Sequence, residues 1–387
     1  MKSFKIDENI FWVGGIDWSL RDFHGYTTER GSTYNSYLII DEKITLIDTV
    51  KHYLFDEFLE RIKDVVDPSK IDYIIINHVE MDHSGSLPKI LNIAKNAQIV
   101  TNPQGEKGLK LHYGENLNIK VIKTKDKLNI GKDNLIFFQT PMVHWPDNMV
   151  TYLENRKILF SNDAFGQHYS SFYRFDFENP LDEIIYQAKK YYANIVLPYS
   201  QQVQTALNLL KDLEIKIIAP SHGIIWKENI SNILKEYQNW SKDPSKKKVV
   251  IVYDTMWGST EIMAKKYYEF FEKEGYEVVL MSLKTNHISD IMTEVLDSSI
   301  IGIGTPTLNK QPLPSVSGFL TYLLGLNPKN KKFFIFGSYG WGGEGTKIIK
   351  EDLEKYSNNV FLEEKIQYIP KEENIENLKN NIKRSLL

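Results

Sequence analysis

The sequence predicts a chain of two parts, the first with two sheets flanked by helices and the second with a doubly wound parallel sheet. Three observations support this prediction. Short apolar runs and amphipathic stretches fill the chain as far as residue 240, a polar stretch follows, and strands and helices alternate strictly from residue 249 onward. With 387 residues, the chain is long enough for two domains with separate cores.

The first part contains many short runs of β-branched and aromatic residues bounded by turn residues, which is typical of strands. We expect strands at 10–13, 37–40, 43–48, 73–76, 98–101, 120–122, 135–139, 149–153, 157–160, 195–197 and 216–219. Apolar residues spaced three to four apart predict helices at 53–65, 86–94, 181–192 and 201–212. Two sheets with helices beside them would satisfy this pattern.

The stretch 241–248, Ser-Lys-Asp-Pro-Ser-Lys-Lys-Lys, has the composition of a linker. Proline, serine and a run of lysines cannot join an apolar core. An ordinary surface loop would look the same, but the pattern changes directly after it. We therefore expect a first domain over 1–240, a linker over 241–248 and a second domain over 249–387.

The second part alternates between apolar runs and amphipathic helices. We expect strands at 249–253, 277–281, 299–304 and 333–337, and helices at 261–271, 289–295, 315–324, 345–355 and near 375–386. Such alternation requires crossover connections, which place parallel strands in one sheet with helices on both faces.

Composition excludes several classes of protein. A net charge of −3 argues against a nucleic-acid binder. No apolar run approaches the roughly 20 residues of a membrane span, and the N-terminus has no signal-peptide core, so we expect a cytoplasmic protein. Cysteine is absent, so any metal must be held by nitrogen and oxygen atoms.

The hexad His78-Val-Glu-Met-Asp-His83 follows the apolar run 73–76 and concentrates two imidazoles and two carboxylates. Ionisable groups this close desolvate and repel one another unless a multivalent cation compensates their charge. The alternative is a solvated polar loop. Because further metal-binding residue types follow downstream, the hexad predicts a metal site.

Three later residues, His144, Asp163 and His222, each lie at the edge of a predicted strand. Alone, each could be a polar residue of the core or of a loop. Together with the hexad they give four imidazoles and three carboxylates, too many for one ion. Two ions fit this count, one held by His78, Glu80 and His144, the other by Asp82, His83 and His222, with Asp163 as the bridge. Nitrogen and oxygen ligands suit iron or zinc, and the share of carboxylates favours iron.

This ligand order resembles the di-iron form of the metallo-β-lactamase fold in flavodiiron proteins, or A-type flavoproteins. The zinc hydrolases of that superfamily usually carry histidine where this chain has Glu80. The stretches 12–18, 22–26, 33–37, 142–146 and 192–195 also resemble the family. The resemblance implies a metallo-β-lactamase-like αββα sandwich followed by a flavodoxin-like domain. It also implies that His24 and His168 approach the metal pocket without binding metal, as hydrogen-bond or proton donors. Tyr192 is a further candidate for such a donor. Packing in the core would explain Tyr192 as well, and a hydrogen bond to the backbone would explain His168.

A flavin site is predicted in the second part. The turn 255–260, Thr-Met-Trp-Gly-Ser-Thr, connects the first strand of this part to a helix, and hydroxyls with amides at a helix N-terminus can hold a phosphate. An ordinary N-cap is the alternative. Two more strand-end loops would meet the same edge, and the whole resembles flavodoxin, which binds flavin mononucleotide (FMN). The expected FMN residues are Thr255, Met256, Trp257, Gly258, Ser259, Thr260, Pro306, Thr307, Leu308, Asn309, Ser338, Tyr339, Gly340, Trp341, Gly342 and Gly343.

The resemblance implies an oxidoreductase with FMN and two non-haem iron ions per chain, which reduces dioxygen to water, nitric oxide to nitrous oxide, or both. It further implies a head-to-tail homodimer, or a dimer of such dimers. An external donor would be required, either rubredoxin, a related small carrier or a reduced deazaflavin. Two alternatives stay open at this point. A zinc hydrolase with an appended flavodoxin would contain zinc and cleave esters, and a flavin electron carrier would keep its function after loss of His83.

Overall fold

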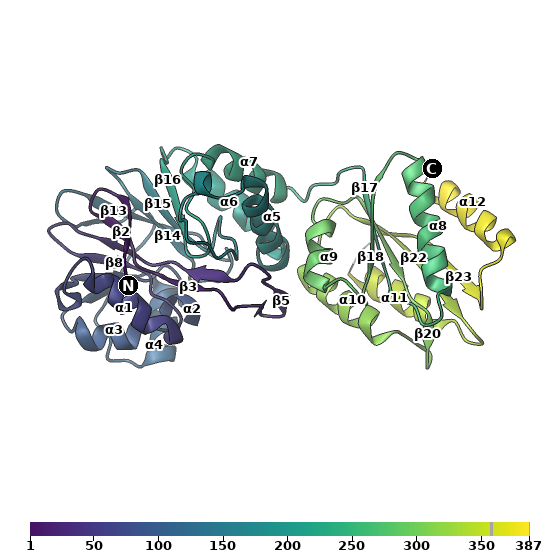
Figure 1. The fold of residues 1–387 in the computed structure, drawn as a ribbon, viewed down its shortest axis with the longest axis horizontal. Helices are drawn as coiled ribbons and strands as arrows, with labels where there is room; N and C mark the ends of the chain where they lie inside the picture. The colour runs from purple at the N-terminus through teal and green to yellow at the C-terminus, as the bar shows by residue number, and fades with distance from the viewer. Residues whose placement is uncertain (357–358, 387) are drawn as a thin grey trace. The chain divides into compact units, whose positions relative to one another are not determined.

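The computed structural model describes residues 1–356 and 359–386. The backbone forms two compact units, drawn in Figure 1 as separate α/β bodies. The first unit contains Met1–Tyr191 and Gln201–Gln238, and the second contains Tyr192–Ser200 and Asn239–Leu387. The predicted linker at 241–248 stays a prediction. Within the described residues, every helix is too short or too polar to cross a lipid bilayer.

The first unit contains two main sheets. The seven-stranded sheet has the order β1-β2-β7-β8-β9-β10-β11 and the five-stranded sheet the order β12-β13-β14-β15-β16. The strands of the first are Phe4–Asp7, Ile10–Trp12, Tyr37–Ile39, Thr45–Ile47, Tyr73–Ile75, Gln98–Thr101 and Ile119–Val121, and those of the second are Lys127–Asn129, Asn134–Gln139, Met149–Leu153, Ile158–Asn162 and Ile217–Pro220. Two short antiparallel pairs complete the unit: β3 (Gly15–Asp17) with β6 (Ser32–Tyr34), and β4 (Asp22–Phe23) with β5 (Tyr26–Thr27).

A continuous apolar core holds the two sheets together. Ile39, Ile75 and Val100 from the first sheet pack in one cluster with Phe137 and Phe160 from the second. All five side chains are almost completely buried. Because β-branched and aromatic residues fit a pleated surface buried on one or both sides, these runs form strands, and their burial is the main stabilising contribution to the fold.

Helices cover the sheets of the first unit. Figure 1 shows α1, α3 and α4 beside the seven-stranded sheet and α5, α6 and α7 beside the five-stranded sheet. These helices span Phe55–Lys63, Leu87–Ile93, Pro103–Tyr113, Leu181–Tyr191, Ser200–Leu210 and Ile230–Trp240. This arrangement is the predicted αββα sandwich.

The second unit is a parallel sheet of order β18-β17-β19-β22-β23, with α8 and α12 on one face and α9 and α10 on the other (Figure 1). Its strands are Glu277–Ser282, Lys248–Tyr253, Ile300–Gly304, Lys332–Tyr339 and Asn359–Gln367. Its helices α8 to α12 span Ser259–Lys273, Ile288–Val295, Pro314–Leu326, Glu344–Lys355 and Glu372–Leu386, and a small hairpin pairs β20 (Thr307–Leu308) with β21 (Gln311–Pro312). All four strand pairs are parallel, as predicted for a doubly wound sheet.

One predicted strand, 195–197, is wrong. The residues continue α5 as a π-helical turn over Tyr192–Val196 and a 3-10 turn over Leu197–Tyr199. The apolar run is buried, but Pro198 lacks the amide hydrogen that a strand would contribute, and proline suits the first turn of a helix. The structure also contains elements that the sequence did not predict, among them α4, whose N-terminus is capped by the Asn102 side chain.

Candidate metal centre and flavin site

The hexad begins just beyond β9 and contains the start of a short helix, α2 (Met81–Ser84). Several hydrogen bonds fix its backbone. The carbonyl of His83 accepts from the amide of Thr49 at 2.8 Å and from its hydroxyl at 2.6 Å, and the Ser84 hydroxyl donates to the carbonyl of Val79 at 2.6 Å. The hexad is therefore held rigidly at the end of the sheet, as a preorganised ligand set requires.

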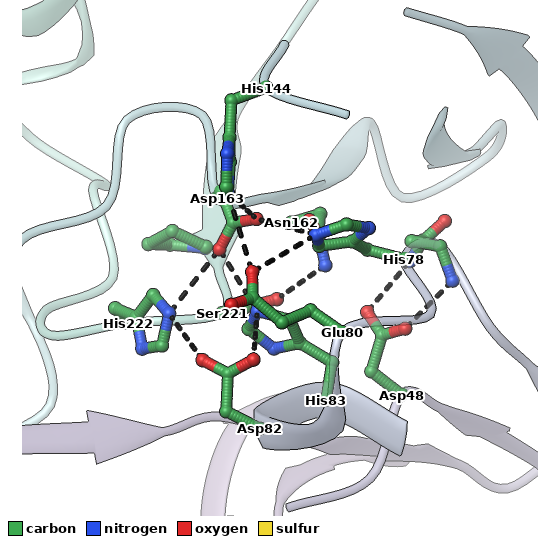
Figure 2. Close-up of polar contacts among 12 residues, drawn as sticks. Asp48, His78, Glu80, Asp82, His83, His144, Asn162, Asp163, Ser221 and His222 are labelled. Carbon is green, nitrogen blue, oxygen red and sulfur yellow. Dashed lines mark hydrogen bonds and ion pairs between the residues drawn. The ribbon is translucent and has the colours of Figure 1, made fainter. Parts of the chain in front are cut away.

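The other three predicted ligands come from the second sheet. His144 lies between β13 and β14, Asp163 directly follows β15, and His222 lies two residues beyond β16. Strands β15 and β16 are parallel neighbours, so their carboxyl ends meet at one edge. Figure 2 shows all seven side chains directed toward a common centre.

Six of the seven side chains form two groups around this centre, and Glu80 is the seventh. His78, His144 and Asp163 make one group and Asp82, His83 and His222 the other, and within each group the candidate ligand atoms lie within 4.8 Å of one another. His144 is partly buried, and the remaining five residues of these groups are buried. Two groups of this composition correspond to two adjacent metal positions.

Asp163 has one carboxylate oxygen in each group. Its Oδ2 lies 3.8 Å from His78 Nε2 and 3.5 Å from His144 Nε2. Its Oδ1 lies 3.0 Å from His83 Nε2 and 3.3 Å from His222 Nε2. A carboxylate in this position can bind two ions at once, one through each oxygen.

The two remaining carboxylates each belong to one side of the centre. Glu80 Oε2 lies 3.3 Å from His78 Nε2 and 3.5 Å from His144 Nε2. Asp82 lies 3.4 Å from His83 Nε2 and 3.3 Å from His222 Nε2, each through a different oxygen. Each metal position thus faces two imidazoles and one carboxylate of its own, in addition to Asp163.

The unpaired polar atoms of the centre fit two divalent cations. Both carboxylate oxygens of Asp82 and Asp163 and both ring nitrogens of His83 are buried and make no hydrogen bond within the described residues. Leaving ionised groups buried without such partners is costly, whereas cations of total charge +4 would compensate three carboxylates and bind the free nitrogens.

Without metal, the carboxylates attract protons to the histidines. Burial opposes the charged form of His144, but contacts with Asp163 and Glu80 outweigh it and raise its pKa to about 9. Burial likewise opposes the charged form of His222, but Asp163 and Asp82 raise its pKa to about 10. Metal binding must therefore displace protons from these imidazoles.

Two further groups orient the histidines, and the sequence did not reveal either of them. The buried carboxylate of Asp147 lies 2.9 Å from His78 Nδ1 and accepts a hydrogen bond from the Val79 amide at 2.8 Å. His222 Nδ1 donates to the carbonyl of Thr33 at 2.9 Å. A bond at Nδ1 leaves Nε2 free to bind metal and fixes the ring. In the sequence, only the position of Asp147 three residues after His144 could have indicated that it lies near the metal centre.

Replacement of Asp147 by Asn should weaken metal binding on the His78 side of the centre. The amide keeps the size of the carboxylate but removes its charge, so His78 becomes a weaker and less well oriented ligand. We expect the affinity for this ion to fall by about 10- to 100-fold. Competition with a chelator measures the change, and exposed Asp212→Asn is the control. Unchanged affinity in Asp147→Asn would contradict a role in orienting His78.

The predicted accessory residues lie in different surroundings. His24 Nε2 lies 2.8 Å from Glu80 Oε1, and this bond raises the pKa of the exposed His24 ring. His168 is buried with Nδ1 2.6 Å from the Ser32 hydroxyl, and burial lowers its pKa well below the usual value. The Tyr192 hydroxyl lies 3.0 Å from the Ser200 hydroxyl. The ring of Tyr191 lies 5.2 Å from that of His168 and 5.9 Å from that of His222, a position that the sequence did not indicate.

A cavity of about 340 Å³ opens beside the centre, and we refer to it as the mouth. Glu80 and Asp82 form part of its wall, so the mouth reaches the metal positions from solvent. Its lining consists of Asp22, Phe23, His24, Lys51, His52, Tyr53, Glu80, Met81 and Asp82.

The predicted phosphate turn connects β17 to α8. The Gly258 amide donates to the Thr255 hydroxyl at 3.0 Å, and Gly258 has a φ of +89° directly before the helix. The hydroxyls of Thr260 and Ser338 lie 2.9 Å apart and join this turn to the loop after β22. The turn therefore presents backbone amides at the N-terminus of a helix of 15 residues, which suits a phosphate group.

The three predicted flavin loops surround a cavity of about 480 Å³. Trp257 and Trp341 at its edge are 93% and 95% exposed, so both indoles are free to cover a planar ligand. The lining consists of Met256, Trp257, Ser259, Pro306, Thr307, Leu308, Asn309, Ser338, Tyr339, Gly340, Trp341, Tyr368 and Ile369. Gly342 lines an adjoining cavity of about 400 Å³, and Gly343 precedes α11 with a φ of +117°. Tyr368 and Ile369 were not predicted because they follow β23, a strand that the sequence pattern did not reveal.

Replacement of Gly258 by Ala should weaken FMN binding. A Cβ at this position would meet no atom within 4 Å, so its effect comes from the left-handed backbone, which costs an L-residue about 1–2 kcal/mol. If the turn relaxes to avoid this strain, FMN affinity falls about tenfold. Flavin fluorescence titration measures the change. Gly318→Ala in α10, also with no atom within 4 Å, is the control and should leave affinity unchanged.

Comparisons with known proteins match both units. The family described as "ODP family beta lactamase" matches residues 33–223, and the flavodoxin family matches residues 251–380. The nitric oxide reductase of Moorella thermoacetica is 40% identical over 378 residues, which cover 96% of this chain and 95% of that protein.

Several solved structures resemble the whole chain, among them the following two. Rubredoxin oxygen:oxidoreductase from the anaerobe Desulfovibrio gigas superposes with a TM-score of 0.96 at 38% identity, covering all of both chains. The flavodiiron protein of Giardia intestinalis superposes with a TM-score of 0.95 at 36% identity, covering 100% of this chain and 97% of that one. With two buried ligand groups bridged by Asp163, a flavodoxin-like second unit and relatives of this similarity along its whole length, the chain belongs to the flavodiiron protein family.

Proposed function

We propose that this protein is an oxidoreductase that passes electrons from an external donor through FMN to a non-haem di-iron centre, where dioxygen is reduced to water, nitric oxide to nitrous oxide, or both. The observation that carries the proposal is Asp163, whose two oxygens face two separate groups of imidazoles and carboxylates. The relatives of this chain named nitric oxide reductase and rubredoxin-oxygen oxidoreductase support both reactions.

We assign the seven ligands as the distances suggest. One iron takes His78, Glu80 and His144, the other takes Asp82, His83 and His222, and Asp163 bridges them. Two ferrous ions held there would supply electrons for reduction of the gas, and FMN held in the second unit would supply electrons to the centre. The protein fixes the ligand positions through Asp147 and the Thr33 carbonyl, and keeps the centre within a buried environment.

Protons for the reaction enter through the mouth in this proposal. His24 is exposed and bonded to Glu80, so its ring can take a proton from solvent and hold it next to the centre. His168 cannot serve in the same way, because burial keeps its imidazole neutral at physiological pH. Its Nε2 has no hydrogen-bond partner within the described residues and can act as a hydrogen-bonding group in the pocket. The Tyr192 hydroxyl bonds to Ser200, so we assign Tyr192 to packing.

The electron donor is a separate small carrier in this proposal. The sequence has no cysteine, so it cannot hold the cysteine-ligated iron of a rubredoxin. The relative named rubredoxin-oxygen oxidoreductase favours a rubredoxin-like donor over a reduced deazaflavin.

A head-to-tail homodimer, or a dimer of such dimers, completes the proposal. Large apolar side chains are exposed both beside the flavin cavity and at the mouth, where Tyr53 and Met81 are about half exposed. Pairing of these surfaces would bury both. Light scattering of the purified protein measures its mass, and a monomer would contradict this part of the proposal. The cytoplasmic location stays a prediction.

Anaerobic stopped-flow oxidation tests the reaction. The fully reduced protein, with its iron and FMN contents known, is mixed separately with dioxygen and with nitric oxide while flavin absorbance is followed. Rapid oxidation that yields water without free peroxide, or nitrous oxide, supports the proposal, and the faster gas identifies the preferred substrate. Protein that contains iron and FMN but reacts with neither gas would contradict it. Zinc with esterase activity would indicate a hydrolase instead.

A further inference from the structure

A small apolar cavity lies behind the loops that carry two of the assigned metal ligands. Its volume is about 20 Å³. Its wall consists of side chains from the loop after β13, from β14, from the segment after β15, from α6 and from α7. These residues are Thr140, Val143, Val150, Ala164, Phe165, Val203, Ala206, Leu207, Leu210 and Tyr237. We refer to it as the gas cavity.

The wall of the gas cavity is rigid on the side of Phe165. The Phe165 amide donates to the Tyr237 hydroxyl at 2.7 Å, and its carbonyl accepts from Trp226 Nε1 at 2.8 Å. The rings of Phe165 and Tyr237 lie 4.4 Å apart. Both polar groups of the Phe165 backbone are therefore bonded, and its ring is held against the cavity.

The gas cavity is adjacent in sequence to the metal centre on two sides. Val143 directly precedes His144, and Ala164 directly follows Asp163. The Val143 amide donates to the Thr140 carbonyl at 3.1 Å, which fixes the turn before His144. Figure 2 shows His144 and Asp163 entering the centre from above and Asp82 from below, and Asp82 belongs to the lining of the mouth.

The two cavities differ in chemistry. Three carboxylates, two imidazoles and a lysine line the mouth beside Phe23, Tyr53 and Met81. The gas cavity is lined by aliphatic and aromatic side chains apart from two hydroxyl-bearing residues, Thr140 and Tyr237. A buried water needs two to four polar partners, whereas an apolar gas needs none and leaves water favourably for an apolar site.

We propose that the gas cavity holds one molecule of diatomic gas, dioxygen or nitric oxide, next to the metal centre before reaction. This inference rests on the proposed function. The volume exceeds the roughly 10–15 Å³ that one water needs by this measure, so a small diatomic molecule fits. Protons and ions use the mouth, and the uncharged substrate is concentrated on the other side of His144 and Asp163.

Gas reaches this site past α6. Val203 and Leu210 on this helix are buried, but Ala206 and Leu207 between them are only half-buried. The wall is thus thin at these two residues, and a side chain larger than Ala206 would fill the cavity from its outer edge.

Xenon, an apolar probe of similar size, tests the site without any turnover. Crystals of the protein with its metals and FMN are pressurised with xenon. We expect a xenon peak between Val143, Phe165 and Val203 in the unaltered protein and no peak in Ala206→Phe. Asn208→Phe, which adds the same ring at an exposed position of α6, is the control and should retain the peak. Absence of xenon from the unaltered protein would overturn the proposal.

Stopped-flow measurement then tests the role of the site. Ala206→Phe should lower the second-order rate constant for gas severalfold, while flavin reduction by a chemical reductant stays unchanged. Loss of xenon with an unchanged gas rate would overturn the proposal. If Ala206→Phe does not fold, Leu207→Ala enlarges the cavity and should raise xenon occupancy and the gas rate, and unchanged values there would also overturn it. Failure of the proposed function can be distinguished from failure of this inference. In the first case the unaltered protein would react with neither gas, whatever its xenon occupancy.

Discussion

Asp163→Asn should remove both metal ions and abolish gas reduction while FMN stays bound. Each oxygen of Asp163 faces a different pair of imidazoles, so loss of the charge weakens both metal positions at once. The amide also places an NH₂ group, which does not ligate metals, toward one of the two ions. Loss of an orienting group alone costs about 10- to 100-fold in affinity or activity, and loss of a shared ligand should exceed that range.

Metal analysis of the purified Asp163→Asn protein, together with its flavin absorbance, measures this effect. The exposed Asp212, just beyond the end of α6, provides a matched control, because Asp212→Asn makes the same chemical change away from the centre. We expect the control to keep two iron ions per chain. If Asp163→Asn lost only one ion, Asp163 would be a terminal ligand of the other site and the bridging assignment would be wrong.

Both the fold class and the positions of the seven residues could be predicted because they depend on local patterns. The strict alternation after residue 249 allows only a parallel sheet with crossover helices, and the structure has that sheet. Each predicted metal residue lies at or near the end of an apolar run, and the ends of neighbouring strands such as β15 and β16 meet at one edge. The residue types and their positions at the strand ends were therefore sufficient to predict that the seven side chains lie close together.

The sequence did not reveal features that depend on tertiary contacts. Asp147 is an ordinary loop carboxylate until folding places it 2.9 Å from His78 Nδ1. Tyr191 and Tyr192 are equivalent in a helical pattern, and only packing brings the ring of Tyr191 next to His168. Strand β23 contains Glu363, Glu364 and Lys365, so its pattern lacks the apolar run of a buried strand. Tyr368 and Ile369 could not be predicted without it.

The affinity of the metal-free protein for iron should rise steeply with pH. In that state the pKa of His144 is raised to about 9 and that of His222 to about 10, so both imidazoles hold a proton at neutral pH. Iron binds only the neutral imidazole, and each proton that binding displaces makes affinity rise about tenfold per pH unit below the pKa. Because His144 and His222 lie in different ligand groups, both ions should show this dependence, and the increase should level off above these pKa values.

Anaerobic titration of the metal-free protein with ferrous iron, with the released protons recorded at constant pH, measures this displacement directly. At neutral pH we expect at least one proton per ion, and fewer as the pH approaches the pKa of His222. The exposed His112 on α4 is the matched control, because His112→Ala removes an imidazole outside the centre and should leave proton release unchanged. Binding without proton release at neutral pH would mean that the imidazoles of the metal-free centre are already neutral, and iron affinity would then not change with pH in this range.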